Sequence, residues 1–271
     1  MAEPAPALRS AGRAPRRPKR IGARVFAATV TATRQLTPHM RRLTVHAPEF
    51  ADYTPAGPDE YLGLLMPRDA QTPLTLPGDD GTENIRAAVA AIPEDLRPDL
   101  RWYTLRAHRP ESAEIDIDFV VHGDEGPGTR FARRAEAGSV LGVRECTALY
   151  APLPGARTRV IAGDESAIPA IARILETTDA GSSHVFIEIG DAAERQDLPG
   201  DVHWVMREGQ RPGIRLEEAV RTADLPAEID YAWVCGERLG VQEIRRHLVD
   251  RGVDKDRITF SGYWRLGEAR G

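Results

Sequence analysis

The sequence contains little cysteine and no long hydrophobic run. Cys146 and Cys235 are its only cysteines, so it can build no disulfide scaffold and cannot alone supply the roughly four thiolates that hold an iron–sulfur cluster. Cysteine and histidine residues show no zinc-ligand spacing, so we expect no metal site. Because no stretch of about 18 apolar residues is present, we expect no membrane-spanning helix. Any redox chemistry must therefore use an organic cofactor.

Charge is unevenly distributed along the chain. Residues 1–24 carry seven basic residues and one acidic residue, a net charge of +6, whereas the whole chain has −5 and the remainder therefore −11. We expect residues 1–21 to be a basic, disordered tail, which lacks the apolar core of a secretion signal; contact with nucleic acid or a membrane surface is the alternative. The acidic remainder argues against nucleic-acid binding as the main function, and we expect a cytoplasmic protein.

The length of 271 residues fits one large domain or two of ordinary size. Residues 22–152 alternate apolar and polar positions between Pro- and Gly-rich loops, which predicts a small antiparallel β-barrel. Its expected strands cover residues 24–31, 40–46, 61–66, 102–107, 115–121 and 140–143.

After the Pro/Gly stretch at 152–155 the pattern changes, and strands alternate with helices. That alternation predicts an α/β domain over residues 156–271, with a parallel sheet covered on both faces. The expected strands are 159–162, 184–189, 202–206, 231–235 and 258–260, and the expected helices are 167–176, 216–221 and 241–249.

The segment Arg101-Trp102-Tyr103-Thr104 has the residue types of a flavin site. On a strand, Arg101 and Tyr103 point to the same side, so one can meet a phosphate while the other lies beside an aromatic ring. Thr104 offers a hydroxyl and a backbone N–H to a flavin nitrogen. We expect Tyr103 to lie at the cofactor rather than in the core; ordinary sheet packing is the alternative.

A Gly-rich turn, His122 to Thr129, follows about twenty residues later and opens a helix that we expect to begin around Thr129. A helix N-terminus has free N–H groups and partial positive charge, so it can bind phosphate. Gly126 and Gly128 let the backbone approach a ligand without an intervening Cβ. The alternative is a capping turn, with Thr129 as N-cap and nothing bound.

These segments, in this order before an α/β domain, are typical of flavin reductases of the ferredoxin–NADP reductase type. More specifically, residues 22–267 resemble the siderophore-interacting protein family, the FAD-dependent ferric-siderophore reductases. The segments that carry the resemblance are Tyr103–Arg106, Ile115–Gly123, Gly126–Ala132, Ala162–Ala170 and Ser261–Gly267.

The resemblance implies an FAD site in the barrel. Arg101 would bind the pyrophosphate, Tyr103 would lie against the isoalloxazine ring and Thr104 near its N5. The turn would bind the pyrophosphate and the adenosine end. Its implied ligands are His122, Gly123, Gly126, Pro127, Gly128 and Thr129.

The resemblance also implies cofactor contacts in the α/β domain. Gly163, Asp164, Glu165 and Ser166 follow its first strand, where a parallel sheet receives a dinucleotide phosphate, although no Gly-x-Gly-x-x-Gly is present. Cys235 matches a Cys-Gly element near the nicotinamide; a small buried residue at a strand end is the alternative. Trp264 would cover a flavin face, or else pack the last strand.

One departure from the family concerns the substrate. Family members often carry His-x-Lys on an early barrel strand, with the Lys facing the substrate, whereas Tyr61 and Gly63 stand at those places here. The chain has only two lysines, so the cationic contacts must come from arginine or be missing. We expect Arg130 and Arg265 to serve, followed by Arg68 and Arg106.

The resulting hypothesis is an FAD-dependent oxidoreductase that reduces a ferric siderophore and releases Fe(II). NADPH or NADH, or alternatively reduced ferredoxin, would donate electrons, and a flavin can convert a pair into single electrons. Outer-sphere transfer needs no dedicated acid or base, so we expect no catalytic residue. The alternatives are a flavin reductase with another acceptor and a non-catalytic flavin or siderophore binder.

Overall fold

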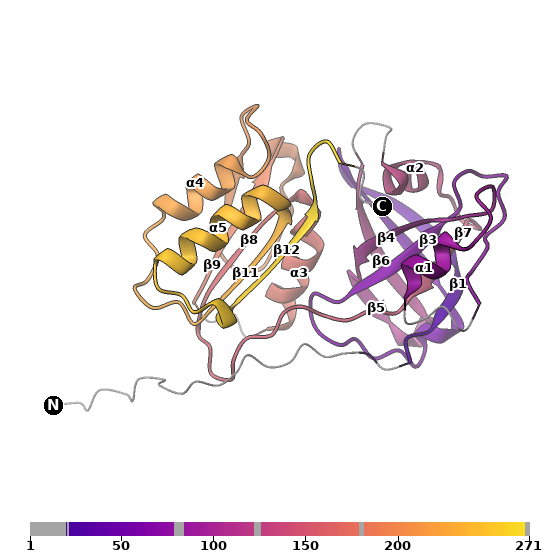
Figure 1. The fold of residues 1–271 in the computed structure, drawn as a ribbon, viewed down its shortest axis with the longest axis horizontal. Helices are drawn as coiled ribbons and strands as arrows, with labels where there is room; N and C mark the ends of the chain where they lie inside the picture. The colour runs from indigo at the N-terminus through magenta and orange to yellow at the C-terminus, as the bar shows by residue number, and fades with distance from the viewer. Residues whose placement is uncertain (1–19, 21, 79–83, 122–125, 179–181, 269–271) are drawn as a thin grey trace.

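The structure is a computed structural model that describes residues 20, 22–78, 84–121, 126–178 and 182–268, and these form a barrel and an α/β domain (Figure 1). The barrel is an antiparallel sheet with strand order β4-β3-β7-β1-β2-β6-β5, in which β4 also lies against β6. Its strands are β1 (Val25–Thr37), β2 (Met40–His46), β3 (Tyr61–Met66), β4 (Asp99–Thr104), β5 (Ala107–Arg109), β6 (Glu114–Val120) and β7 (Val140–Arg144).

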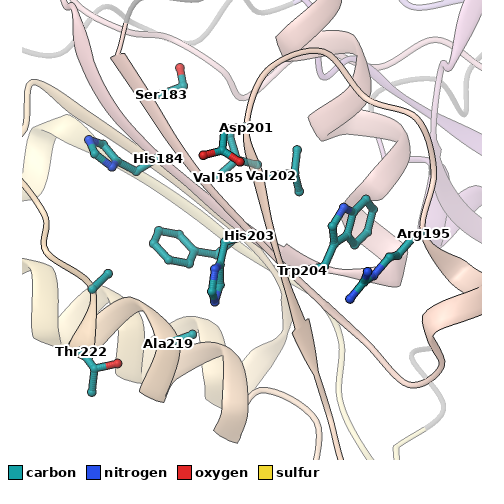
Figure 2. Close-up of a pocket in the computed structure, with 12 residues that line it drawn as sticks. Ser183, His184, Val185, Arg195, Asp201, Val202, His203, Trp204, Ala219 and Thr222 are labelled. Carbon is teal, nitrogen blue, oxygen red and sulfur yellow. The ribbon is translucent and has the colours of Figure 1, made fainter.

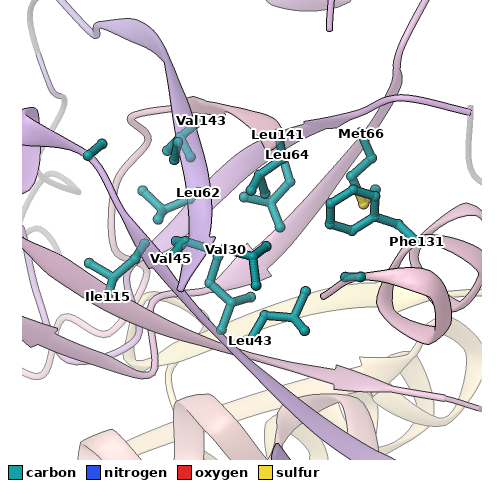
Figure 3. Close-up of a cluster of buried hydrophobic side chains, with 14 of the residues drawn as sticks. Val30, Leu43, Val45, Leu62, Leu64, Met66, Ile115, Phe131, Leu141 and Val143 are labelled. Carbon is teal, nitrogen blue, oxygen red and sulfur yellow. The ribbon is translucent and has the colours of Figure 1, made fainter. Parts of the chain in front are cut away.

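The barrel core consists of the apolar residues that alternate along these strands, and Figure 3 shows part of it. In β1, for example, Phe26, Ala28 and Val30 are buried while the residues between them are exposed. Helix α2 (Pro127–Arg134) inserts Phe131 into the same core. Burial of one such side chain contributes about 1.5–3 kcal/mol, which anchors α2 to the barrel.

Three features of the barrel differ from the sequence-based expectation. β1 continues to Thr37, because its backbone pairs with β2 beyond the last buried position. The strand expected over 102–107 ends at Thr104, and β5 begins at Ala107. A short helix, α1 (Ile85–Ala90), was not expected; the Asn84 side chain accepts a hydrogen bond from the N–H of Ala87 at its start.

The α/β domain is a five-stranded parallel sheet of order β10-β9-β8-β11-β12. All the strands and helices expected there are present; the strand expected over 202–206 has the predicted ends, and the others are shifted at one end or both. The strands are β8 (Thr158–Asp164), β9 (Ser182–Ile189), β10 (Val202–Met206), β11 (Tyr231–Glu237) and β12 (Ile258–Trp264). The helices are α3 (Ile168–Thr177), α4 (Ile214–Thr222) and α5 (Arg238–Asp250), and the 3-10 helix η4 (Glu165–Ala167) precedes α3.

Helices cover both faces of this sheet. α3 packs on one face with Ile161 and Trp233, and α4 and α5 pack on the other face with Val160 and Val234. Burial on both faces explains the continuous apolar runs in β8 and β11. The predicted architecture, a barrel followed by an α/β domain, is thus confirmed. None of the helices in the described ranges is long and apolar enough to cross a membrane.

The two domains are joined by polar contacts, one buried and one at the surface. Asp59, which precedes β3, is buried and accepts a hydrogen bond of 2.8 Å from the indole N–H of Trp233 in β11. Arg106 of the barrel forms two hydrogen bonds, of 2.9 and 2.6 Å, with the carboxylate of Glu176 in α3. These contacts fix the barrel against the sheet of the second domain.

Candidate functional site

Tyr103 and Gly128 are in direct contact at the start of α2. The Tyr103 ring lies on Phe119 of β6, with 4.2 Å between ring centroids, and its hydroxyl reaches the first turn of α2. A Cβ at position 128 would stand 1.6 Å from the Tyr103 hydroxyl oxygen. The Tyr103 side chain therefore requires glycine at position 128, whether or not a ligand also approaches this residue. Because Tyr103 packs against the barrel core, the expectation that it lies away from the core was wrong.

The N-terminus of α2 presents backbone N–H groups without side-chain partners. The helix begins at Pro127 with Gly126 as N-cap, two residues before the expected start, so the alternative with Thr129 as N-cap was wrong. Thr129 instead lies in the first turn, where its hydroxyl donates to the carbonyl of Val120. Among the described residues, no side chain accepts from the N–H groups of Gly128 or Thr129, which are buried. Such groups require an acceptor, and a phosphate would supply one.

Arg101 lies on β4, the strand that carries Tyr103. Its guanidinium is half-buried and donates one hydrogen bond, of 2.7 Å, to the carbonyl of Leu100. Burial lowers the pKa of Arg101; Asp99 and Tyr103 oppose that effect, and the charges of Arg86 and Arg130 add to it. A desolvated cation among other cations, without a carboxylate partner in the described part of the chain, is suited to an anionic ligand.

The two arginines expected at the substrate lie in different domains. Arg130 projects from α2 and forms an ion pair with Asp99 at 3.4 Å, close enough to Arg101 for their charges to interact. Arg265 follows β12 and pairs with Glu268 within a turn. Arg130 thus lies on the side of the expected cofactor phosphates, whereas Arg265 lies beside Trp264.

The remaining barrel predictions have varied outcomes. Thr104 is buried and pairs with Tyr61 in the β3–β4 ladder. Arg106 forms an ion pair with Glu176 of α3 and lies 3.9 Å from Asp118, so it contributes to the contact between the two domains. Arg68 donates to the carbonyl of a loop residue, Glu94. His122 and Gly123 lie outside the described residues.

In the α/β domain, Asp164 is the centre of a hydrogen-bond network. Its carboxylate accepts from the N–H and hydroxyl of Ser166 at 2.9 and 2.5 Å, from the N–H of Glu237 at 2.7 Å and from the indole N–H of Trp264 at 2.8 Å. Burial, and secondarily the charge of Glu165, raises the pKa of Asp164 to about 6, although these hydrogen bonds oppose the shift. Asp164 therefore joins β8, β11 and β12 where their carboxyl ends meet.

The neighbours of Asp164 also have partners within the protein. A Cβ at Gly163 would lie 2.5 Å from that of Ala167 and 2.8 Å from the carbonyl oxygen of Cys235, so Gly163 permits close packing. Glu165 forms an ion pair with Arg207 and accepts from a backbone N–H of the β9 loop. The residues expected to receive a dinucleotide phosphate are therefore engaged in internal contacts.

Cys235 has no exposed surface in this structure. Its thiol lies at the Tyr263 hydroxyl, and burial raises the pKa of Cys235 well above its usual value. This placement matches the alternative of a small buried residue and not direct contact with a nicotinamide. Trp264, by contrast, is half-exposed above Asp164, at the carboxyl edge of the sheet.

Three buried carboxylates with several internal hydrogen bonds were not predicted. Asp59 accepts from Trp233, and Glu188 and Glu237 accept from backbone N–H groups at the starts of α4 and α5. One signal could have revealed Glu188, because it is the single charged residue in the apolar run of β9. Glu237 could have been recognised as an acidic residue placed directly before a helix.

A surface hollow lies at the opposite edge of the α/β sheet from β12. Figure 2 shows it around the edge strand β10, where His184, His203, Trp204 and Thr222 are among the lining residues. None of the predicted nucleotide or flavin ligands lines it.

Two family models match the chain, one on each domain. The siderophore-interacting FAD-binding domain matches residues 29–147, and the siderophore-interacting protein model matches residues 156–267. The chain belongs to the siderophore-interacting protein family. This confirms the resemblance deduced from the sequence and the FAD-binding character of the barrel.

Individual relatives agree with this assignment. The ferric vibriobactin reductase ViuB of Vibrio cholerae is 29% identical over 85% of each protein. The siderophore-interacting protein SipS of Aeromonas hydrophila is 30% identical, with a TM-score of 0.75 and coverage of 92% of this chain and 94% of that one. A siderophore utilization protein from T. fusca is 29% identical, with a TM-score of 0.78 over 93% and 97%.

Proposed function

We propose that this member of the family is an FAD-dependent ferric-siderophore reductase. The observation that carries the proposal is the start of α2, where the N–H groups of Gly128 and Thr129 have no side-chain acceptor among the described residues and lie beside Tyr103, whose strand also carries Arg101. The reductase activity of its relative ViuB supports the same reaction.

The residues present fit FAD. Arg101 and the start of α2 would hold the pyrophosphate by charge and by N–H donors, and Tyr103 would present its ring to the flavin. FAD, when bound, supplies the capacity to accept electrons in pairs and release them singly, which matches a one-electron acceptor such as Fe(III). We name no catalytic acid or base, because outer-sphere reduction requires only close approach.

The substrate is proposed to be a ferric siderophore, with Arg130 and Arg265 as the cationic contacts for its anionic groups. Siderophore oxygens bind Fe(III) much better than Fe(II), so reduction releases the metal. NADPH, NADH and reduced ferredoxin are the donors compatible with this scheme. We also propose a cytoplasmic location, which is supported by two cysteines that are both free and buried.

One experiment tests the proposal directly. The purified protein, loaded with FAD and reduced with dithionite under anaerobic conditions, is mixed with a ferric siderophore. We expect reoxidation of the flavin and capture of Fe(II) by a chelator, at rates above those of free FAD. A protein that is reoxidised only by other acceptors would be a flavin reductase of a different pathway, and one that binds no FAD would contradict the proposal.

A further inference from the structure

The carboxyl edge of the α/β sheet is already filled by the protein's own carboxylates. In open parallel sheets, dinucleotides bind at this edge, where the strand order reverses and helix N-termini can meet phosphates. Here the reversal lies between β8 and β11, the strands that end in Asp164 and Glu237. Gly236 lies in β11, directly before Glu237, and a Cβ at this position would lie 2.7 Å from the Asp164 carboxylate. The Asp164 carboxylate therefore fills the crevice between β8 and β11.

The helices α4 and α5 are capped internally at this edge. Glu188, which is fully buried, accepts from the N–H groups of Gly213 and Leu216 at the start of α4. Glu237, exposed to only 2%, accepts from the N–H groups of Leu239 and Gly240 at the start of α5. The N–H groups at the starts of α4 and α5 therefore have carboxylate partners, in contrast to those of α2. Before α3, whose own N-cap is Ala167, Asp164 accepts from the N–H of Ser166.

The helix starts also leave no space between them. A Cβ at Gly213 would lie 2.8 Å from the Cα of Gly240, and one at Gly240 would lie 2.6 Å from the Cα of Gly213. The two backbones are thus in contact where the N-termini of α4 and α5 converge.

The charge of this edge is unfavourable for a phosphate as well. Four carboxylates, those of Asp164, Glu165, Glu188 and Glu237, lie at this edge, and Arg207 is the guanidinium that contacts two of them. Arg207 itself is committed to Glu188 at 3.1 Å and to Glu165 at 2.5 Å. A pyrophosphate brought into the crevice would meet these carboxylates, of which Asp164, Glu188 and Glu237 are buried, at close range, where Coulomb repulsion is strong.

We propose that Asp164, Glu188 and Glu237 keep dinucleotide phosphates off this edge, so that electrons reach the flavin from a one-electron protein carrier and not from bound NADH or NADPH. The inference rests on the proposed reductase function and selects between its donors. Two reduced carriers would each give one electron, and two ferric complexes would each accept one. Any proton taken up by the flavin on reduction is returned on reoxidation.

The first test measures binding. Oxidised NAD and NADP are titrated into the FAD-loaded protein by calorimetry. We expect no saturable binding with a dissociation constant below about 1 mM, the upper end of ordinary KM values. Removing a charge while keeping a hydrogen-bond acceptor, in Glu188→Gln and Glu237→Gln, should strengthen binding by roughly three- to tenfold each. Glu243→Gln, an exposed change on α5, is the matched control and should have no effect. Saturable binding to the wild type with a dissociation constant below about 1 mM would overturn the proposal.

The second test measures reduction of the bound flavin. N-benzyl-1,4-dihydronicotinamide donates hydride without any phosphate, so it reports access to the flavin alone. We expect NADH and NADPH to react no faster than this compound and without saturation, and reduced plant-type ferredoxin to react faster at equal concentration. Saturable, faster reduction by either coenzyme, or ferredoxin no faster than NADH, would contradict the proposal. The dithionite experiment above tests the acceptor reaction separately, so failure of the reductase function is distinguishable.

Discussion

The hydroxyl of Tyr103 occupies the place where residue 128 would carry its Cβ. The separation would be 1.6 Å, so residue 128 must be glycine while Tyr103 keeps its position against Phe119. One tyrosine therefore links the barrel core, strand β4 and the first turn of α2. The shape of that turn, where we propose that a phosphate binds, depends on this packing as well as on the absence of a Cβ at Gly128.

Gly128→Ala should therefore act through Tyr103. In the wild-type background we expect a loss of about 1–3 kcal/mol in the free energy of unfolding, typical of overpacking, together with weaker FAD binding. In a Tyr103→Ala background the same change should be neutral, or stabilising by up to about 1 kcal/mol, because alanine favours helix. Urea denaturation of the four proteins measures this coupling. Equal effects in both backgrounds would show that the contact does not matter.

Tyr103 itself should contribute to both cofactor binding and stability. Tyr103→Ala should weaken FAD binding by roughly 1–3 kcal/mol, by analogy with lost aromatic stacking, and should also lower the free energy of unfolding by about 3 kcal/mol. Tyr103→Phe keeps the ring and should retain most of both. Fluorescence titration with FAD and urea denaturation measure the two quantities. Full FAD affinity in the alanine variant would show that Tyr103 does not contribute to FAD binding.

The fold was predictable wherever burial produced a repeating pattern. Alternation located β2 and β3 at their observed ends, and the apolar runs located every strand of the α/β domain. The pattern failed where backbone pairing continued without burial, as in β1 beyond Val30, and where a helix was too short to establish a period, as in α1.

The candidate site was less predictable because its contacts join distant segments. Sequence reasoning placed Arg101 and Gly128 in one site, yet it could not show that Tyr103 fills the space over Gly128. Similarly, Asp164 resembled part of a ligand loop, whereas its partners Glu237 and Trp264 follow 73 and 100 residues later. Hydrogen bonds over such separations have no local signature.

Asp164 should make stability depend on pH. Its pKa is raised to about 6 in the folded protein from an ordinary value near 3.8, so the folded state binds the proton more tightly. The resulting stabilisation is complete below pH 4 and is lost as pH rises through 6. Wild type should thus lose roughly 3 kcal/mol relative to Asp164→Asn between pH 4 and 7, an order-of-magnitude value from linkage. Urea denaturation at several pH values checks this, and a constant difference would show that Asp164 does not titrate in that range.

The substrate contacts should appear in the acceptor reaction and be sensitive to salt. Arg130→Ala and Arg265→Ala should each raise KM for an anionic ferric siderophore, because each variant loses a charge-assisted contact worth about 1–2 kcal/mol. The wild-type rate should fall as salt screens the attraction. Arg246→Ala, which removes an exposed arginine with a similar short-range pair on α5, is the matched control. Measurements start from dithionite-reduced protein saturated with FAD, so the donor does not influence them.

Because Arg130 lies near Arg101, FAD affinity is measured for each variant as well. A loss of FAD affinity at unchanged KM would assign Arg130 to the cofactor phosphates, and unchanged KM for both variants without a salt effect would show that arginines do not replace the missing lysine.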